Sequence, residues 1–203
     1  MTREVDPDKR ATLRRFAALG TATSLATSGT AAAADGDDSA ARDAIRGYLA
    51  TTPGAHFSKL RDDLSLATGE TQHHLRHLES AEEVTSRKDG DYRRYFPAGR
   101  FSAFQRRALG YLRRDTPRGM LLGLLRDPGA SGADLARALG VSRPTVSTHA
   151  GDLAEAGLLD TDGGYRVTRP EVLIALVVRY ADSFGPDAVA FADDAAEFIS
   201  YDG

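Results

Sequence analysis

The sequence of 203 residues contains no cysteine, which excludes disulfides, thiolate zinc sites and cysteine nucleophiles. It is also poor in lysine and glutamate, with 3 Lys against 23 Arg and 8 Glu against 21 Asp. A surface rich in aspartate stays hydrated in concentrated salt, and this composition is typical of a halophilic archaeon. A GC-rich genome that favours arginine and aspartate codons gives the same bias, so composition alone identifies no function.

An apolar run long enough to span a membrane is missing as well. The nearest candidate lies in residues 1–41, where Arg14 and Arg15 precede a mildly apolar run that threonine and serine dilute. This run resembles a twin-arginine export signal, but Ala17 and Ala18 stand where large apolar residues are usual. We interpret residues 1–41 as a low-complexity tail, or as the product of an upstream start codon, with export as the alternative.

Charge is unevenly distributed along the chain. The net charge is −3, yet residues 98–127 sum to +5 and residues 170–203 sum to −6. The chain therefore has a basic middle and an acidic C-terminal part. Its hydrophobic content of 41% is sufficient for one medium domain or two small ones with real cores.

Two stretches of the sequence match at an offset of 75 positions, mostly at apolar residues, which indicates a duplicated structural unit. The matching pairs include Gly54 and Gly129, Leu60 and Leu135, Leu64 and Leu139, His74 and His149, and Leu78 and Leu153.

Each copy predicts three helices followed by a β-hairpin. The helices are expected at residues 42–51, 58–64 and 69–79 in the first copy, and at 117–126, 132–139 and 143–152 in the second. Ser58, Thr68, Ser131 and Ser142 are candidate N-caps, and Asp-Gly sequences at 89–90 and 162–163 indicate the hairpin turns. The prediction is a mainly α fold with small β-hairpin wings (α+β), a tandem winged helix-turn-helix.

The third helix of the second copy has two distinct faces. Val146, Ala150 and Leu153 recur at helical spacing and predict a buried stripe, which directs Arg143 and Ser147 outward. Arginine can pair bidentately with guanine in a major groove, and short hydroxyl side chains contact phosphates or base edges. In the first copy Thr71, Leu75 and Leu78 form the stripe, and Glu70, Gln72, His73 and Arg76 face outward.

The segment "ADLARALGVSRPTVSTHAGDLAEAGLL" resembles the core of winged helix-turn-helix transcriptional regulators of the MarR/ArsR-like type. The resemblance implies double-stranded DNA as the partner of residues 42–170. The first copy departs from the pattern, because Glu82 replaces a glycine and Gly69-Glu70 replaces Arg-Pro.

Four basic residues lie within eight positions of the first wing, a cluster that suits phosphate or minor-groove contact. The alternative is a solvated hairpin with ordinary charges. The complete set of candidate DNA-binding residues is Ser142, Arg143, Pro144, Thr145, Ser147, Thr148 and His149; Thr68, Gln72, His73 and Arg76; Arg87, Lys88, Arg93 and Arg94; and Arg166.

The remaining segments are a basic linker helix at residues 98–116 and a C-terminal helical segment at residues 171–203. The linker arginines are expected either to follow a DNA backbone or to neutralise the acidic tail. The apolar residues after Pro170 exceed what one small domain needs, which favours a homodimer over packing on the same chain. On this reading residues 42–97 and 117–170 are the two winged helices.

The sequence favours a cytoplasmic regulator over an enzyme. His73 and His77 have a spacing that can chelate zinc, but no ligating carboxylate is identifiable nearby, so we expect no metal and no cofactor. No nucleophile–base arrangement or phosphate-binding loop is found. The alternative function is a winged-helix module that binds another protein instead of DNA.

Overall fold

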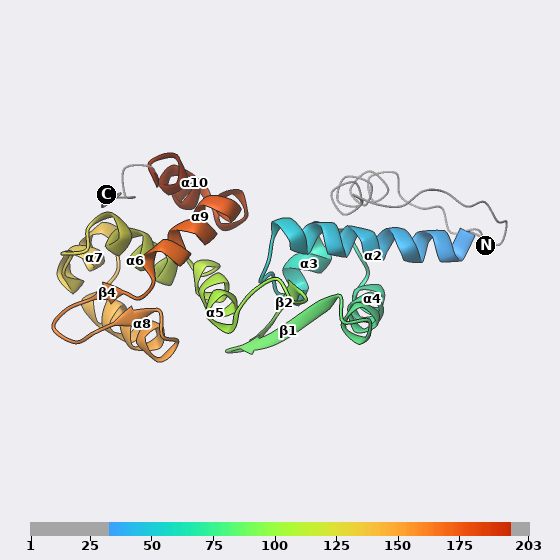
Figure 1. The fold of residues 1–203 in the computed structure, drawn as a ribbon, viewed down its shortest axis with the longest axis horizontal. Coiled ribbons are helices and arrows are strands. Elements are labelled where there is room, and N and C mark those ends of the chain that lie inside the picture. The colour runs from blue at the N-terminus through green and yellow to red at the C-terminus, as the bar shows by residue number, and fades with distance from the viewer. Residues whose placement is uncertain (1–32, 196–203) are drawn as a thin grey trace. The chain divides into compact units, whose positions relative to one another are not determined.

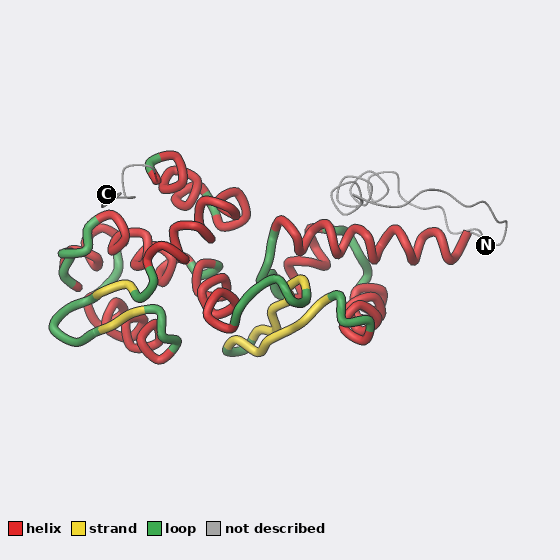
Figure 2. Tube along the Cα trace, in the orientation of Figure 1, coloured by secondary structure: helices red, strands yellow, loops and turns green. Residues whose placement is uncertain are grey.

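The computed structural model describes residues 33–195, with side chains from Asp38 onward. Most of the predicted tail, residues 1–32, lies outside the described residues. The described part consists of helices and two separate antiparallel hairpins (Figures 1 and 2). It divides into two compact units, residues 1–101 and residues 102–203, which are treated separately below.

In its described part, from residue 33 onward, the first unit contains three helices and one hairpin. Its elements are α2 (Ala33–Thr51), α3 (Phe57–Asp63), α4 (Thr68–Ser80), β1 (Val84–Asp89) and β2 (Tyr92–Pro97). Helix α2 begins at Ala33 instead of the predicted Arg42, and the aspartates that follow Ala33 and Ala34 are favourable near a helix N-terminus. The strands pair from Val84 with Pro97 to Asp89 with Tyr92.

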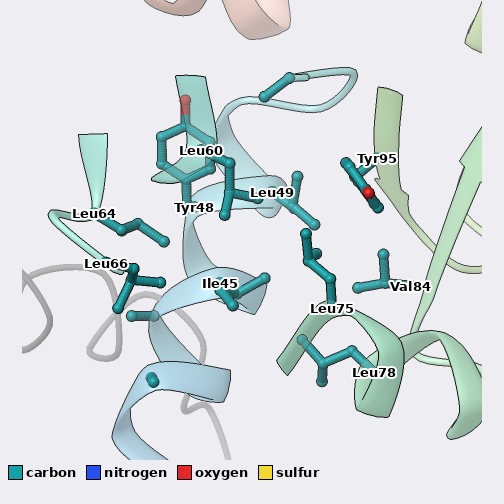
Figure 3. Close-up of a cluster of buried hydrophobic side chains, with 13 residues drawn as sticks. Ile45, Tyr48, Leu49, Leu60, Leu64, Leu66, Leu75, Leu78, Val84 and Tyr95 are labelled. Atoms are coloured by element: carbon teal, nitrogen blue, oxygen red, sulfur yellow. The ribbon is translucent and has the colours of Figure 1, made fainter. Parts of the chain in front are cut away.

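One apolar core holds these elements together (Figure 3). Ile45 and Leu49 of α2 face Leu75 and Leu78 of α4, and all four side chains are buried. The predicted α4 stripe is therefore confirmed, including the buried Thr71, whose hydroxyl donates to the Ala67 carbonyl at 2.9 Å.

The second unit contains six helices and a short hairpin among its described residues. The predicted stripe of α8, Val146, Ala150 and Leu153, is buried as expected. The elements are α5 (Ala103–Leu112), α6 (Asp115–Arg126), α7 (Gly132–Leu139), α8 (Arg143–Glu155), β3 (Leu159–Asp160), β4 (Arg166–Val167), α9 (Pro170–Phe184) and α10 (Pro186–Asp193).

Helix α5 is an integral part of the second unit. Phe104, Ala108 and Leu112 are buried, and α5 packs against α6 and α9. The next helix starts at Asp115, two residues before the predicted Pro117, because proline is tolerated in a first helical turn and an acidic residue there is favourable.

The C-terminal helices pack onto their own unit. Leu173, Leu176, Val177 and Tyr180 are buried, α9 contacts α5 and α10, and α10 contacts α6. The surplus of apolar residues that favoured a homodimer is thus used within the chain, which was the alternative expectation.

The offset of 75 positions between the two copies recurs in the backbone. Helices α4 and α8 each contain 13 residues, and both ends of α8 lie 75 positions after those of α4. Helix α7 begins 75 positions after α3, and β3 begins 75 positions after β1. The prediction of a mainly α, winged helix-turn-helix fold with small β-hairpins is confirmed.

Two backbone positions with positive φ also recur in both copies. Gly140 (φ 66°) and Gly157 (φ 69°) follow α7 and α8, and in the first unit Ser65 (φ 54°) and Glu82 (φ 55°) occupy the same positions. The left-handed conformation brings Cβ close to the following carbonyl oxygen, so the first unit carries strain that glycine avoids in the second.

We expect Ser65→Gly and Glu82→Gly each to raise the free energy of unfolding of the first unit by about 1 kcal/mol, because each removes a Cβ from a left-handed position. Urea denaturation of each variant measures the change. The matched controls Gly140→Ser and Gly157→Glu should lower the stability of the second unit. Destabilisation by both glycine substitutions would contradict the explanation.

Candidate nucleic-acid interface

Helix α8 begins with a side-chain cap that also determines which polar groups stay available. Ser142 Oγ accepts from the Thr145 amide at 3.2 Å and lies 2.8 Å from the Thr145 hydroxyl, which confirms the predicted cap. Thr148 donates to the Pro144 carbonyl at 3.0 Å, so its hydroxyl is engaged with its own helix. Arg143 and Ser147 remain fully on the surface.

The C-terminal end of α8 is held by α5. Arg107 Nε donates to the Ala156 carbonyl at 2.6 Å, and the Tyr111 hydroxyl donates to the Asp152 carbonyl at 3.1 Å. The Ala156 carbonyl lies at the helix end and lacks an intrahelical partner, so Arg107 satisfies it, whereas the Asp152 carbonyl also accepts from the Ala156 amide at 3.1 Å. With its start capped and its end anchored, α8 presents its outer face in one orientation.

Further arginines of residues 98–127 bind groups within the second unit. Arg113 donates to the Ser183 carbonyl at the end of α9, and Arg118 is buried between Asp115 at 2.9 Å and Asp187 at 2.7 Å. Arg126 lies 3.4 Å from Asp194. Arg118 and Arg126, which follow the predicted linker, thus neutralise acidic groups, whereas the linker residues Arg107 and Arg113 bind backbone carbonyls.

Helix α4 starts differently from the prediction. Its N-cap is Ala67, and Thr68 is the first helical residue, so the prediction of Thr68 as the cap is wrong. Glu70 accepts from the Ala67 amide at 3.1 Å and thereby satisfies a free donor at the helix start. Similarly, α3 is capped by His56 instead of the predicted Ser58, whereas the prediction of Ser131 for α7 is confirmed.

The predicted outward face of α4 forms one continuous surface. Gln72, His73 and Arg76 are all exposed and border an open hollow of about 300 Å³. Glu70 is not part of this hollow, because its carboxylate is engaged at the helix start. The remaining residues that border the hollow are Gly69, His77 and Ser80.

His74, which aligns with His149, has a different environment from its counterpart. Its side chain is 1% exposed, and its Nδ1 has no hydrogen-bond partner among the described residues. Burial lowers the pKa of His74 below the ordinary 6.5, although Asp38 near its Nε2 opposes this effect. His149 is half-exposed, with Nδ1 3.5 Å from Asp152.

We expect the first unit to lose stability as the pH falls below about 6.5, because the unfolded chain then binds a proton that the buried His74 resists. The pKa of His74 is lower in the folded chain than in the unfolded chain. The resulting stabilisation of the first unit is therefore fully present above the unfolded pKa, and it is lost as the pH falls through the folded pKa. Thermal unfolding against pH measures this. His74→Leu should remove most of the dependence in this range, and an unchanged profile would contradict the assignment.

The first wing separates its four basic residues into two groups. Lys88 and Arg93 are exposed, and Arg87 is half-buried. Arg94 is 3% exposed, pairs with the buried Asp89 and donates to the Gly54 carbonyl at 3.1 Å. The prediction of Arg94 as a DNA contact is therefore wrong, because its guanidinium is used to join the wing to the turn after α2.

We expect Arg94→Leu to lower the free energy of unfolding of the first unit by roughly 3 kcal/mol, because Asp89 would be left buried without its partner. The neighbouring Arg93→Leu is the matched control and should change stability little, since its contact with Glu79 is exposed. Chemical denaturation of both variants distinguishes them, and equal losses would contradict the structural role of Arg94.

Two further features of the wings were not found from the sequence. Glu79 accepts from Ser86 and lies 3.3 Å from Arg93, so α4 partly neutralises one wing cation. In the second wing, Arg166 is exposed but lies 2.6 Å from Asp160. In the sequence, Glu79 differs from its counterpart in the second copy, Ala154, and this difference was the only available signal of a particular role for Glu79.

Comparison with known families agrees with this geometry. Residues 39–109 match a family model described as an N-terminal HTH domain, and residues 115–164 match a model of the MarR family. The two matches support a winged-helix transcriptional regulator. Its domains are those of DNA-binding regulators, and the two matches together include α4 and α8. Searches of curated proteins and of solved structures gave no significant match.

Proposed function

We propose that this regulator binds specific double-stranded DNA sequences through both helix-turn-helix units. Helix α8 lies in a major groove, where Arg143 pairs with a guanine and Ser147 contacts a base edge or a phosphate. Helix α4 enters a groove with Gln72, His73 and Arg76, and the wing cations Arg87, Lys88 and Arg93 bind phosphate. The proposal includes no catalytic activity and no cofactor.

The single observation that carries the proposal is the anchoring of α8 at both ends. A cap at Ser142 and the donors Arg107 and Tyr111 orient a helix whose inner stripe is buried. The outer face then presents an exposed arginine, and no ion pair of Arg143 is found among residues 33–195. A side chain for base reading needs this combination of a fixed backbone and an unengaged donor group.

Two matching reading helices have a physical advantage in concentrated salt. Phosphate contacts release counterions and weaken steeply as salt rises, whereas direct base contacts depend less on it. Once one unit is bound, the linked second unit binds at a high effective concentration, which adds affinity without additional charge. The aspartate-rich composition is consistent with such a setting.

We expect Arg143→Ala and Ser147→Ala to weaken binding to the selected duplex, by about tenfold for the arginine, because one bidentate base pair contributes on the order of 1–3 kcal/mol. Fluorescence titration with genomic fragments, across a salt series, identifies the duplex and measures the change. Arg179→Ala on the exposed side of α9 is the control and should leave affinity unchanged.

The alternative, a module that binds another protein, gives the opposite result. In that case the purified chain has no saturable binding to any genomic fragment at any salt concentration. No specific contact in either unit favours this alternative, and the exposed arginine at the start of α8 suits nucleic acid.

We also propose that the protein acts in the cytoplasm, where its DNA lies. Among residues 33–195 no helix combines the length and apolarity that a membrane crossing requires. Among the described C-terminal residues, a homodimer would use the exposed side of α9, which includes Val178 at 46% exposure, and light scattering of the purified chain measures it.

A further inference from the structure

Tyr92 is the most exposed large hydrophobic residue in the part of the chain that the structure describes. It lies at the start of β2, next to the hairpin turn, and 50% of its surface is accessible. It was not among the residues predicted to bind DNA. An exposed aromatic ring gains little from folding, so its position calls for a physical explanation.

The Tyr92 ring is held in place despite its exposure. It stacks on His56, with ring centroids 4.8 Å apart and planes tilted by 33°. His56 is fixed in turn, because its Nδ1 accepts from the Lys59 amide at 3.3 Å as the cap of α3. The guanidinium of the buried Arg94 lies 5.6 Å from the Tyr92 ring centroid. These contacts order the ring before any ligand arrives.

The second unit shows that the wing fold does not require this exposure. Tyr165 aligns with Tyr92, yet it is half-buried against the start of α7. It can lie there because residue 132 is glycine: an added Cβ would meet Cε2 of Tyr165 at 3.2 Å. The equivalent residue in the first unit is Phe57, so Tyr92 cannot take the same place without displacing it.

The surroundings of Tyr92 are cationic and open. Lys88 and Arg93 pair across the hairpin, and together with Tyr92 and Ser86 they border a hollow of about 360 Å³. Asp91 also borders it and lowers its affinity for anions. The ion pair with Glu79 partly neutralises Arg93, so Lys88 attracts a phosphate more strongly than Arg93 does.

We propose that Tyr92 is a DNA-contacting residue whose ring packs on a deoxyribose of duplex DNA, while Lys88 binds the adjacent phosphate. This inference rests on the proposed DNA-binding function and adds a contact that carries no charge. Packing of the ring on a sugar does not release counterions, so this contact keeps its strength at salt concentrations that weaken the contact between Lys88 and phosphate. The wing of the first unit would then position the chain on DNA without reading sequence.

The sequence offers a clean optical test, because it contains no tryptophan. Tyr92→Trp places a single indole on the wing, and Val178→Trp places one at the other exposed apolar residue. We expect the emission of Tyr92→Trp to change saturably when a mixed-sequence duplex is added, and that of Val178→Trp to stay constant.

Affinity measurements separate the contribution of the Tyr92 ring to DNA binding from that of the Lys88 charge. We expect Tyr92→Ala to weaken binding of the mixed-sequence duplex about tenfold with the salt dependence unchanged, by analogy with aromatic contacts in nucleic-acid complexes. Tyr92→Phe should retain the affinity. Lys88→Ala should lower the slope of log affinity against log salt by about 1. His56→Asn keeps a capping side chain but removes the stacked ring, and should weaken binding less than Tyr92→Ala.

The outcomes distinguish this inference from the proposed function. If the unaltered chain binds no duplex, both fail. If Arg143→Ala weakens binding but Tyr92→Ala does not, and the Tyr92→Trp emission is constant, only the role of Tyr92 is overturned. Tighter binding to a single strand than to its duplex, lost in Tyr92→Ala, would also overturn sugar packing in favour of base stacking. Thermal unfolding of Tyr92→Ala checks that the wing is intact.

Discussion

The burial of one stripe of α4 and of α8 is the constraint on which the rest of the molecule depends. A helix that buries residues at positions i, i+4 and i+7 has its rotation about its own axis determined, and its opposite face is determined with it. Leu75 and Leu78 do this in the first unit, and Val146, Ala150 and Leu153 in the second. The polar face can then vary without loss of the fold, so one scaffold carries two different surfaces.

This constraint explains what could be predicted from the sequence. The apolar period, the offset of 75 positions and the serine caps are local signals, so the fold, α8 and its outward face followed from them directly. The burial of Arg94 did not follow from these signals, because the sequence does not distinguish the four basic residues of the short hairpin from one another. Only the pairing register and the path of the turn at Gly54 bring Arg94 to a buried carboxylate.

The misassigned caps and the C-terminal helices have a similar cause. Thr68 and Ser58 are good capping residues, but Ala67 with Glu70 and His56 with its imidazole satisfy the same amides from neighbouring positions. The apolar side chains of α9 were read as a surface for a second copy because their partner helix α5 is distant in sequence. Periodicity identifies a buried face without identifying what buries it.

The use of arginine connects the composition with the architecture. In a chain with almost no lysine, arginine must supply both surface charge and internal donors, and its planar group with five donors suits the second role. Arg94, Arg107, Arg113 and Arg118 each bind a backbone carbonyl. These four join a wing, a reading helix and the C-terminal helices to their own units. Basic composition in such a chain therefore overstates its DNA-binding charge, and a cation has to be located in the fold before it is assigned to DNA.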